Sequence, residues 1–356
     1  MPFLGSEDLC FTRWAIKSKL PPDPPRRHPS MQAIKNDGWG TGNTDWCSEI
    51  SLKSARGRYY NPGIMSIQTP SAAVTIRRAK PEDAEPCGLI CYKAFHKINS
   101  DHNFPPEMPA PEMGVGVLQM MFSHPSFYCV VAEMGGAIVG SNCLDERSSI
   151  VGIGPITIDP AVQNAGTGRR LMQAVLDRAA QRGAPGIRLV QATFHNRSLS
   201  LYAKLGFEVR ELLSVMQGGP MKISIEGCTV RPAGDDDAAA CDRLCAAVHG
   251  YTRSGEVADA IREGTARVVE RDGHVAGYTT GLGYFGHSVA ESNRDLQALI
   301  GAAEGFDGPG LLVPVRNAAL FRWCLENGLR VVQPCTLMTI GLYNEPAGAW
   351  IPSILM

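Results

Sequence analysis

A short glycine-containing loop, Gln163 to Gly168, carries the residues of this sequence that are best suited to chemistry. It lies between an apolar stretch that ends at Asp159 and a helix-forming stretch that begins at Thr167. Backbone N–H groups at the start of a helix point along the positive end of the helix dipole, and glycine lets a ligand approach the main chain. The pattern therefore favours a site for a phosphate or pyrophosphate group.

Two arginines follow this loop directly. Arg169 and Arg170 fall in the first turn of the predicted helix, where a positive charge opposes the helix dipole at a cost of about 0.3 to 1 kcal/mol. A bound phosphate would offset that cost. The alternative is that both arginines are solvated and the glycines only close a tight loop, and the loop alone does not decide between these interpretations.

Regular elements surround the loop and must position it. The periodicity of apolar residues predicts, in order, a strand over 74–79, a helix over 82–95, two strands within 127–143, a strand that ends at residue 158, a helix over 167–182, a strand over 187–194 and a short helix that ends near residue 206. The two strands within 127–143 meet at a Gly-Gly turn. This order predicts an α/β or α+β fold built on one central sheet.

Two motifs resemble those of one enzyme family. Gln163 to Gly168 matches the Q/R-x-x-G-x-G/A signature of the GNAT acyl-CoA N-acyltransferases, and FHNRSLSLYAKLGF, residues 194–207, resembles the family's second motif, in which an Asn precedes a Tyr-x-x-x-Gly-Phe helix end. The resemblance extends from residue 74 to about residue 216, with the elements in the family's order. It implies a central mixed, mostly antiparallel sheet flanked by helices. It also implies an N-acetyltransferase that uses acetyl-CoA or a short acyl-CoA as co-substrate, without a metal.

The same resemblance implies how the co-substrate would bind. The main chain of the loop would hold the pyrophosphate, and pantetheine would enter a gap where the strand at 156–158 diverges from the strand at 187–194. A backbone N–H near Ile158 would stabilise the oxyanion that develops on the thioester. The implied binding residues are Ile156, Thr157, Ile158, Gln163, Asn164, Ala165, Gly166, Thr167, Gly168, Arg169, His195 and Asn196.

Tyr202 would be the general acid that protonates the departing thiolate, by the same resemblance. Its alternative role is that of a core aromatic residue on a short helix. The family places an Asn seven residues before this Tyr, but here that position is His195 and Asn196 comes one residue later. Asn317 lies seven residues before Cys324 in a second repeat, which supports this register and leaves both His195 and Asn196 as candidates for the contact with CoA.

The acceptor must lose a proton, because an alkylamine with a pKa near 10.4 is mostly ammonium at neutral pH. Asp145 and Glu146, at the turn before the cofactor strand, are the candidate bases, although paired acids in a turn are often only solvated. The segment 96–112 is predicted to be a loop that covers the acceptor pocket. Its His96 and His102 are either bases or ligands, or ordinary surface residues.

The chain contains an internal repeat. Residues 74–91 align without gaps to residues 228–245 with seven identities, and two further pairs of segments follow in the same order, 130–140 with 268–277 and 201–209 with 323–331. Collinear matches of this kind indicate a tandem duplication.

The composition and the repeat together predict three regions of the chain. Residues 1–64 combine Pro-rich and Gly-rich stretches without periodicity and are predicted to be a disordered tail, residues 65–222 to be the catalytic module and residues 223–356 to be a degenerate GNAT-like module. In this last region residues 287–303 lack the Q-x-x-G-x-G pattern, and Cys324 stands where the first module has its tyrosine. A structural role is therefore expected for the second module.

Composition excludes several classes of function. The net charge of −1 and the absence of a lysine-rich stripe argue against a nucleic-acid partner, and no apolar stretch is long enough to cross a membrane. Eleven dispersed cysteines without a CxxC pair and no secretion signal predict free thiols in a cytoplasmic protein. The acceptor is expected to be a small-molecule amine or a protein N-terminus, and a homodimer is one assembly that this interpretation allows.

Two other functions are alternatives to acyl transfer. A non-catalytic acyl-CoA sensor would share the same binding loop. A nicotinamide oxidoreductase is suggested by Gly281, Gly283 and Gly286, which satisfy GxGxxG, but the repeat predicts that these glycines lie within a strand or its bulge and no helix starts there.

Overall fold

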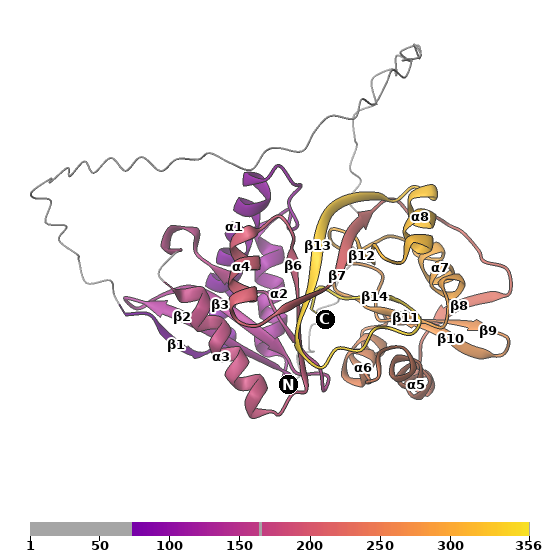
Figure 1. Ribbon diagram of the computed structural model, residues 1–356, viewed down its shortest axis with the longest axis horizontal. Coiled ribbons are helices and arrows are strands. Elements are labelled where there is room, and N and C mark those ends of the chain that lie inside the picture. The colour runs from indigo at the N-terminus through magenta and orange to yellow at the C-terminus, as the bar shows by residue number, and fades with distance from the viewer. Residues whose placement is uncertain (1–72, 164–165, 356) are drawn as a thin grey trace, which may run out of the picture. The chain divides into compact units, whose positions relative to one another are not determined.

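The computed structural model describes residues 73–163 and 166–355, and all structural statements below concern this part of the chain (Figure 1). The tail predicted over residues 1–64 lies outside it. None of the helices in the described part is long and apolar enough to cross a membrane.

The first half of the described chain follows the predicted order of elements. Its strands and helices are β1 (Thr75–Arg78), α1 (Ala84–Asp101), α2 (Pro111–Ser123), β2 (Phe127–Met134), β3 (Ala137–Asp145), β4 (Val151–Ile153), β5 (Thr157–Ile158), α3 (Thr167–Gln181), β6 (Gly186–Ala192), α4 (Asn196–Lys204) and β7 (Glu208–Gln217). Short 3-10 turns precede α1 and α3.

The second half repeats this order. It comprises β8 (Cys228–Pro232), α5 (Ala238–His249), α6 (Ser254–Arg262), β9 (Arg267–Arg271), β10 (His274–Thr279), β11 (Ser288–Ala290), α7 (Asn293–Gly301), β12 (Leu311–Pro314), α8 (Ala318–Glu326), β13 (Arg330–Gly341) and β14 (Ala349–Ile351). The α/β fold with helices flanking mixed, mostly antiparallel sheets is therefore confirmed.

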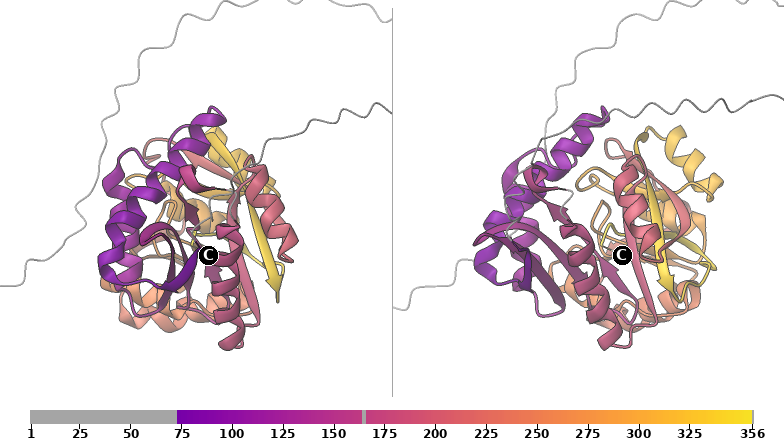
Figure 2. Two further views of the ribbon diagram at one scale, coloured as in Figure 1. Left: turned by 90° about the vertical axis from the view of Figure 1, so that its left-hand side faces the viewer. Right: turned by 60° about the vertical axis from the view of Figure 1, so that its left-hand side comes forward.

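The strands form two sheets, and the larger one contains strands of both halves. A nine-stranded sheet has the order β1-β2-β3-β4-β6-β13-β7-β12, with β5 paired to β3, and a five-stranded sheet has the order β14-β11-β10-β9-β8. The long β13 lies between β6 and β7, as Figures 1 and 2 show. The nine-stranded sheet thus crosses the boundary predicted at residue 222, and the boundary itself stays a prediction.

An exchange of strands explains this mixed sheet. Each half contains a strand, a short helix and a long strand, as β6-α4-β7 and as β12-α8-β13. The long strand of each half pairs with the shorter strand of the other: β13 is antiparallel to β6, with Cys335 opposite Ala192, and β7 is antiparallel to β12, with Leu213 opposite Pro314. Each half therefore completes the sheet of the other.

The two halves also share one ion-pair motif. Arg77 donates two hydrogen bonds to Asp83 at 2.7 and 2.9 Å, and Arg231 donates two to Asp237 at 2.7 and 2.8 Å. Each arginine also binds a glutamate on the neighbouring strand. These are the same positions in the two aligned repeats, so the duplication seen in the sequence extends to side-chain geometry.

Replacing Asp83 with asparagine is expected to lower the free energy of unfolding by about 2 kcal/mol at pH 7, because a buried pair of charge-assisted hydrogen bonds is lost. The hydrogen bonds from Arg77 hold the pKa of Asp83 below its ordinary value of 3.8, so the contribution is present above that pH and is lost as pH falls further. Urea unfolding measures the effect. Glu82→Gln, at an exposed neighbour, serves as control, and equal losses in both variants would contradict the expectation.

Two parts of the sequence analysis need correction. The first helix continues to Asp101 instead of ending at Phe95, supported by an ion pair of 2.8 Å between Lys97 and Asp101 one turn apart, so the predicted loop 96–112 is reduced to residues 102–110. The glycines at 281–286 lie in the loop between β10 and β11, with a single bridge at Gly283, instead of within a strand. No helix begins there, since α7 starts at Asn293.

The helices of the first half cover both faces of its sheet. α3 buries Leu171, Met172, Val175 and Ala179 against one face, as the periodicity predicted. Helices α1 and α2 pack on the other face, around Cys87, Cys91, Leu118 and Met121. The nine cysteines of the described residues are free.

Candidate active site

Strands β4 and β6 separate at the centre of the sheet. They pair in parallel at Val151 with Ile187 and at Gly152 with Arg188, and their pairing ends there. The chain then continues as β5, which pairs only with β3. The gap between β5 and β6 is the divergence that the sequence resemblance implied for residues 156–158, and main-chain groups on its two sides are available to an extended ligand.

The phosphate loop lies at the mouth of this gap. Gly166 caps α3 with φ of +77°, a left-handed conformation that glycine adopts without strain. Thr167 is buried as the first helical residue, and a Cβ on Gly168 would lie 2.9 Å from Cδ1 of Ile158. Residues 164–165, also predicted to bind the cofactor, lie outside the described residues. The start of α3 is thus held directly against the diverging strand.

The two arginines after the loop differ in their surroundings. Arg169 is exposed. Arg170 is also exposed but donates a hydrogen bond to the main-chain oxygen of Val74 just before β1. Only Arg169 therefore stays a candidate for contact with a phosphate.

A cavity of about 400 Å³ opens beside the loop, between the end of α1 and the start of α4. It is lined by Ala94, Lys97, Ile98, Asp101, His102, Gln163, His195, Asn196 and Arg197. Four of these were candidates from sequence: Gln163, His195 and Asn196 for the cofactor, and His102 as a base or ligand. Lys97 and Arg197 were missed, and only the position of Arg197 directly after the predicted Asn196 could have indicated it. Lys97 and Arg197 bring two cations to the lining and Asp101, which pairs with Lys97, brings one anion, so a net positive charge is left that suits a phosphorylated ligand.

His195 and Arg197 set the electrostatics of this cavity. Arg197 donates a hydrogen bond of 2.8 Å to Oε1 of Gln163, which links the start of α4 to the phosphate loop. Burial, together with the charge of Arg197, lowers the pKa of His195 below its ordinary value of 6.5. His195 is therefore neutral at pH 7 and can act as a hydrogen-bond partner without adding charge.

Tyr202 lies on α4 and is buried in the core beneath α3, with its ring edge-on to Phe207. Burial raises the pKa of its hydroxyl, so the group stays protonated at neutral pH. Within residues 73–163 and 166–355 no residue forms a hydrogen bond with that hydroxyl. A protonated phenol without a protein acceptor is suited to donate a proton, although the placement also fits a core aromatic.

The two acids predicted as bases are both paired with arginines. Asp145 binds Arg147 at 2.6 Å, and Glu146 binds Arg178 at 2.6 Å and Arg182 at 2.9 Å. The arginines that hold Glu146 belong to α3, on the face opposite α1 and α2. The role of Asp145 or Glu146 as the base stays a prediction.

A third acid, Glu107, was missed by the sequence analysis. It lies in the loop between α1 and α2, is buried, and accepts hydrogen bonds from Nε2 of Gln333 at 2.8 Å and from the hydroxyl of Tyr284 at 3.3 Å. No ion pair in the described part of the chain involves it, and burial raises its pKa above the ordinary value of 4.5. Gln333 belongs to β13. Two residues later in that strand, Cys335 pairs with Ala192 at the end of β6, the strand that borders the gap.

Comparison with known proteins identifies the first half. Residues 88–207 match the model of the Acetyltransferase (GNAT) family. Residues 88–207 form a GNAT domain. No curated protein is similar to the chain in sequence.

Solved structures share the fold well beyond the GNAT domain. One is a protein of Pyrococcus horikoshii provisionally assigned as an acetyltransferase, with a TM-score of 0.60 and 19% identity over 78% of this chain and 91% of that chain. Another is a GCN5-related N-acetyltransferase from Sphaerobacter thermophilus, with a TM-score of 0.51 and 15% identity over 76% of this chain and 96% of that chain. The overlaps extend past residue 207, so these proteins share the fold of both halves.

The second half lacks the open gap of the GNAT domain. Strand β14 pairs with β11 and contacts β12, the two strands that correspond to the sides of the gap. Ala349 and Ile351 of β14 are buried in the core of this half. The amides of Asn293, at the start of α7, and Asn317, before α8, bind each other at 2.7 and 2.9 Å. The chain itself therefore fills the position that an extended cofactor would take.

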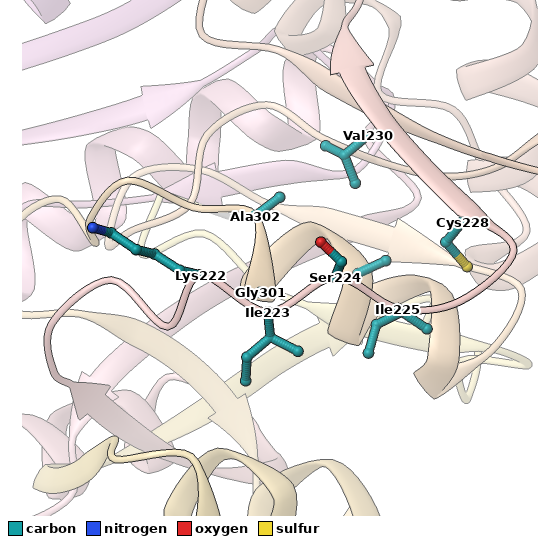
Figure 3. Close-up of a pocket in the computed structure, with 9 residues that line it drawn as sticks. Lys222, Ile223, Ser224, Ile225, Cys228, Val230, Gly301 and Ala302 are labelled. Atoms are coloured by element: carbon teal, nitrogen blue, oxygen red, sulfur yellow. The ribbon is translucent and has the colours of Figure 1, made fainter.

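A second cavity, of about 360 Å³, lies between α7 and the segment that leads into β8 (Figure 3). It is lined by Lys222, Ile223, Ser224, Ile225, Cys228, Val230, Ala298, Gly301 and Ala302. Lys222 is the one charged residue in this lining, and no acid is present to accept a proton from an amine. The cavity beside the GNAT domain's phosphate loop is therefore the better candidate for the active site.

Proposed function

We propose that this protein is an N-acyltransferase that moves an acetyl or short acyl group from acyl-CoA to a primary amine of a small molecule or a protein N-terminus. The observation that carries the proposal is the gap between β5 and β6, together with a cavity that is lined by Gln163 of the loop before α3 and by His195 to Arg197, just after β6. A helix start, left-handed Gly166 and nearby cations match a pyrophosphate, and a gap with free main-chain groups matches pantetheine.

The proposed reaction is a direct transfer. The amine nitrogen attacks the thioester carbonyl carbon, the developing oxyanion accepts a main-chain N–H near Ile158, and the C–S bond then breaks. Tyr202 donates a proton to the departing thiolate, and a carboxylate accepts the proton that the amine loses. No covalent intermediate on the protein is required.

Three acids are candidates for the base, Asp145, Glu146 and Glu107. Arginines bind both oxygens of each of the first two carboxylates. Arg178 and Arg182 lower the pKa of Glu146 despite its burial, whereas burial raises the pKa of Asp145. Glu107 has no arginine partner that would have to be displaced before it accepts a proton, and burial raises its pKa above 4.5. It also lies in the α1–α2 loop, which covers the face of the sheet opposite α3. We therefore favour Glu107 among the three.

Replacing Glu107 with glutamine is expected to lower kcat by about 100-fold, the lower end of the effect of general bases. Because burial raises the pKa of Glu107, the acid limb of the wild-type rate profile should lie above pH 4.5 and should be absent in the variant. Steady-state kinetics from pH 5 to 9 measure both effects. Asp145→Asn and Glu146→Gln are the matched controls, and a larger loss in either would transfer the role to that residue.

The activity is tested by following release of the CoA thiol from acetyl-CoA with a panel of primary amines and N-terminal peptides. Turnover with at least one acceptor is expected. Tight binding of CoA with no turnover on any amine would instead favour a non-catalytic acyl-CoA sensor, which uses the same loop and gap.

A further inference from the structure

Arg188 is a buried cation without an acidic partner. It lies on β6 with 2% of its surface exposed, and its Nη1 donates a hydrogen bond of 2.5 Å to the hydroxyl of Tyr251. The guanidinium lies over the ring of Tyr251 at 4.8 Å and over that of Tyr343 at 5.4 Å. No ion pair of the described residues involves Arg188, so aromatic faces are its main electrostatic support.

Other buried arginines nearby are neutralised. Arg253 binds Glu256 at 2.7 Å, and Arg147 binds Asp145 at 2.6 Å. Taking an unpaired charge out of water is costly, and cation–π contacts offset only part of that cost. Burial accordingly lowers the pKa of Arg188. A residue that costs this much stability is best explained by a ligand that completes its charge.

Two further polar groups around Arg188 lack partners. Nε of Arg188, Nδ1 of His249 and the hydroxyl of Tyr343 are all buried, and none forms a hydrogen bond within the described part of the chain. The ring of His249 lies 5.8 Å from that of Tyr251. A guanidinium, a phenol and an imidazole can each donate a hydrogen bond, and with no carboxylate paired to Arg188 the cluster is complementary to an anion.

The cluster lies beside the start of the gap, on the face of the sheet opposite α3. Arg188 pairs with Gly152 at the last paired position of β4 and β6, so the gap opens one residue further along. Its neighbours Ile187 and Leu189 belong to the core beneath α3, and alternation along the strand turns Arg188 to the opposite face. Continuing the register places Ala192 level with Ile156, about 13 Å along the strand from Arg188. A small molecule can span that separation.

We propose that Arg188, together with His249, Tyr251 and Tyr343, binds the carboxylate of the acceptor, so that the acceptor is an amine that also carries a carboxylate. This inference rests on the proposed function. His249 and Tyr251 come from the second half of the chain and Arg188 from the GNAT domain, so both halves contribute to recognition of one substrate.

The test uses ω-amino acids from glycine to 6-aminohexanoate and, as matched probes, the corresponding carboxamides. Wild-type protein is expected to acetylate at least one acid with a KM at least tenfold below that of its amide, and the same acid is expected to raise the Tm. Arg188→Met should lose both effects: its KM for the acid should rise to that for the amide, and the acid should no longer raise the Tm. The variant should also melt at the same or a higher temperature in the absence of ligand, because an unpaired buried charge is removed.

Arg210→Met is the matched control, because Arg210 also lies 5.4 Å from the ring of Tyr343 but is paired with Glu208. It should keep the preference for the acid. A lower Tm of Arg188→Met with an unchanged preference would show a structural role and overturn the inference, and so would the absence of any preference in the wild type. Carboxylate-dependent binding without turnover would instead reject the proposed function and leave the anion site standing.

Discussion

Replacing Tyr202 with phenylalanine is expected to lower kcat for acetyl transfer by about 1000-fold, within the range that loss of a general acid produces. Tyr202 is buried as a residue, the pKa of its hydroxyl is raised, and the hydroxyl forms no hydrogen bond within residues 73–163 and 166–355, so it can supply a proton only to a ligand. Phenylalanine fills the same space, and the affinity for CoA and the Tm should therefore change little.

The measurement combines kcat with a CoA titration for wild type and Tyr202→Phe. Tyr128→Phe is a suitable control, because Tyr128 packs against the same core but lies on β2, away from the gap. An unchanged kcat in Tyr202→Phe would show that the ring is only a core aromatic and that another group protonates the thiolate.

Replacing Gly166 with valine is expected to raise the KM for acetyl-CoA by about 1000-fold. A Cβ on Gly166 would meet no atom within 4 Å, so neighbouring side chains do not oppose the change. The opposition comes from φ of +77°, which a β-branched residue adopts at a cost of more than 1 kcal/mol. The loop should therefore rearrange and lose about two charge-assisted hydrogen bonds, each contributing about 2 kcal/mol.

A matched control for this variant is Gly219→Val. A Cβ on Gly219 would also meet no atom within 4 Å, but Gly219 has no left-handed conformation and lies outside the site. The KM of this control should equal that of wild type. If both variants bind acetyl-CoA normally, the phosphate-binding role of the loop is wrong.

The sequence predicted the parts of the site that depend on local pattern. Gln163 and Asn196 were found because glycine spacing, helix starts and the Tyr-x-x-x-Gly-Phe motif lie within short stretches of chain. The cavity beside the loop brings these residues together, although α1 also contributes to it. The amphipathic face of α3 was predicted for the same reason, since the 3.6-residue period is local.

Features that depend on pairing between distant segments were not predicted. Glu107 acquires its surroundings from Gln333 and Tyr284, more than 170 residues away, and nothing in the loop's own sequence indicates them. In the sequence, Arg188 is one charged residue within a predicted strand. Its hydrogen-bond partner Tyr251 lies 63 residues away, in the second half of the chain. Strand exchange contributes to both environments through β13, which carries Gln333 and precedes Tyr343. No residue pattern near β7 or β13 specifies which partner strand each will pair with.

The same limit applies to the second half. The loss of the glycine signature and the presence of Cys324 in place of tyrosine indicated a degenerate module, but not how its gap is closed. Strand β14 fills that position from the end of the described chain, through pairing with β11. A short strand of three residues gives too weak a pattern to be placed from sequence.

Calorimetric titration of CoA into the purified wild-type protein tests the central claim most directly. The gap and phosphate loop of the GNAT domain, with the corresponding gap of the second half filled by β14, predict one saturable binding event per chain. Absence of binding would contradict the claim that the phosphate loop and gap bind CoA. Two equivalent sites per chain would contradict the division between an open first half and a closed second half.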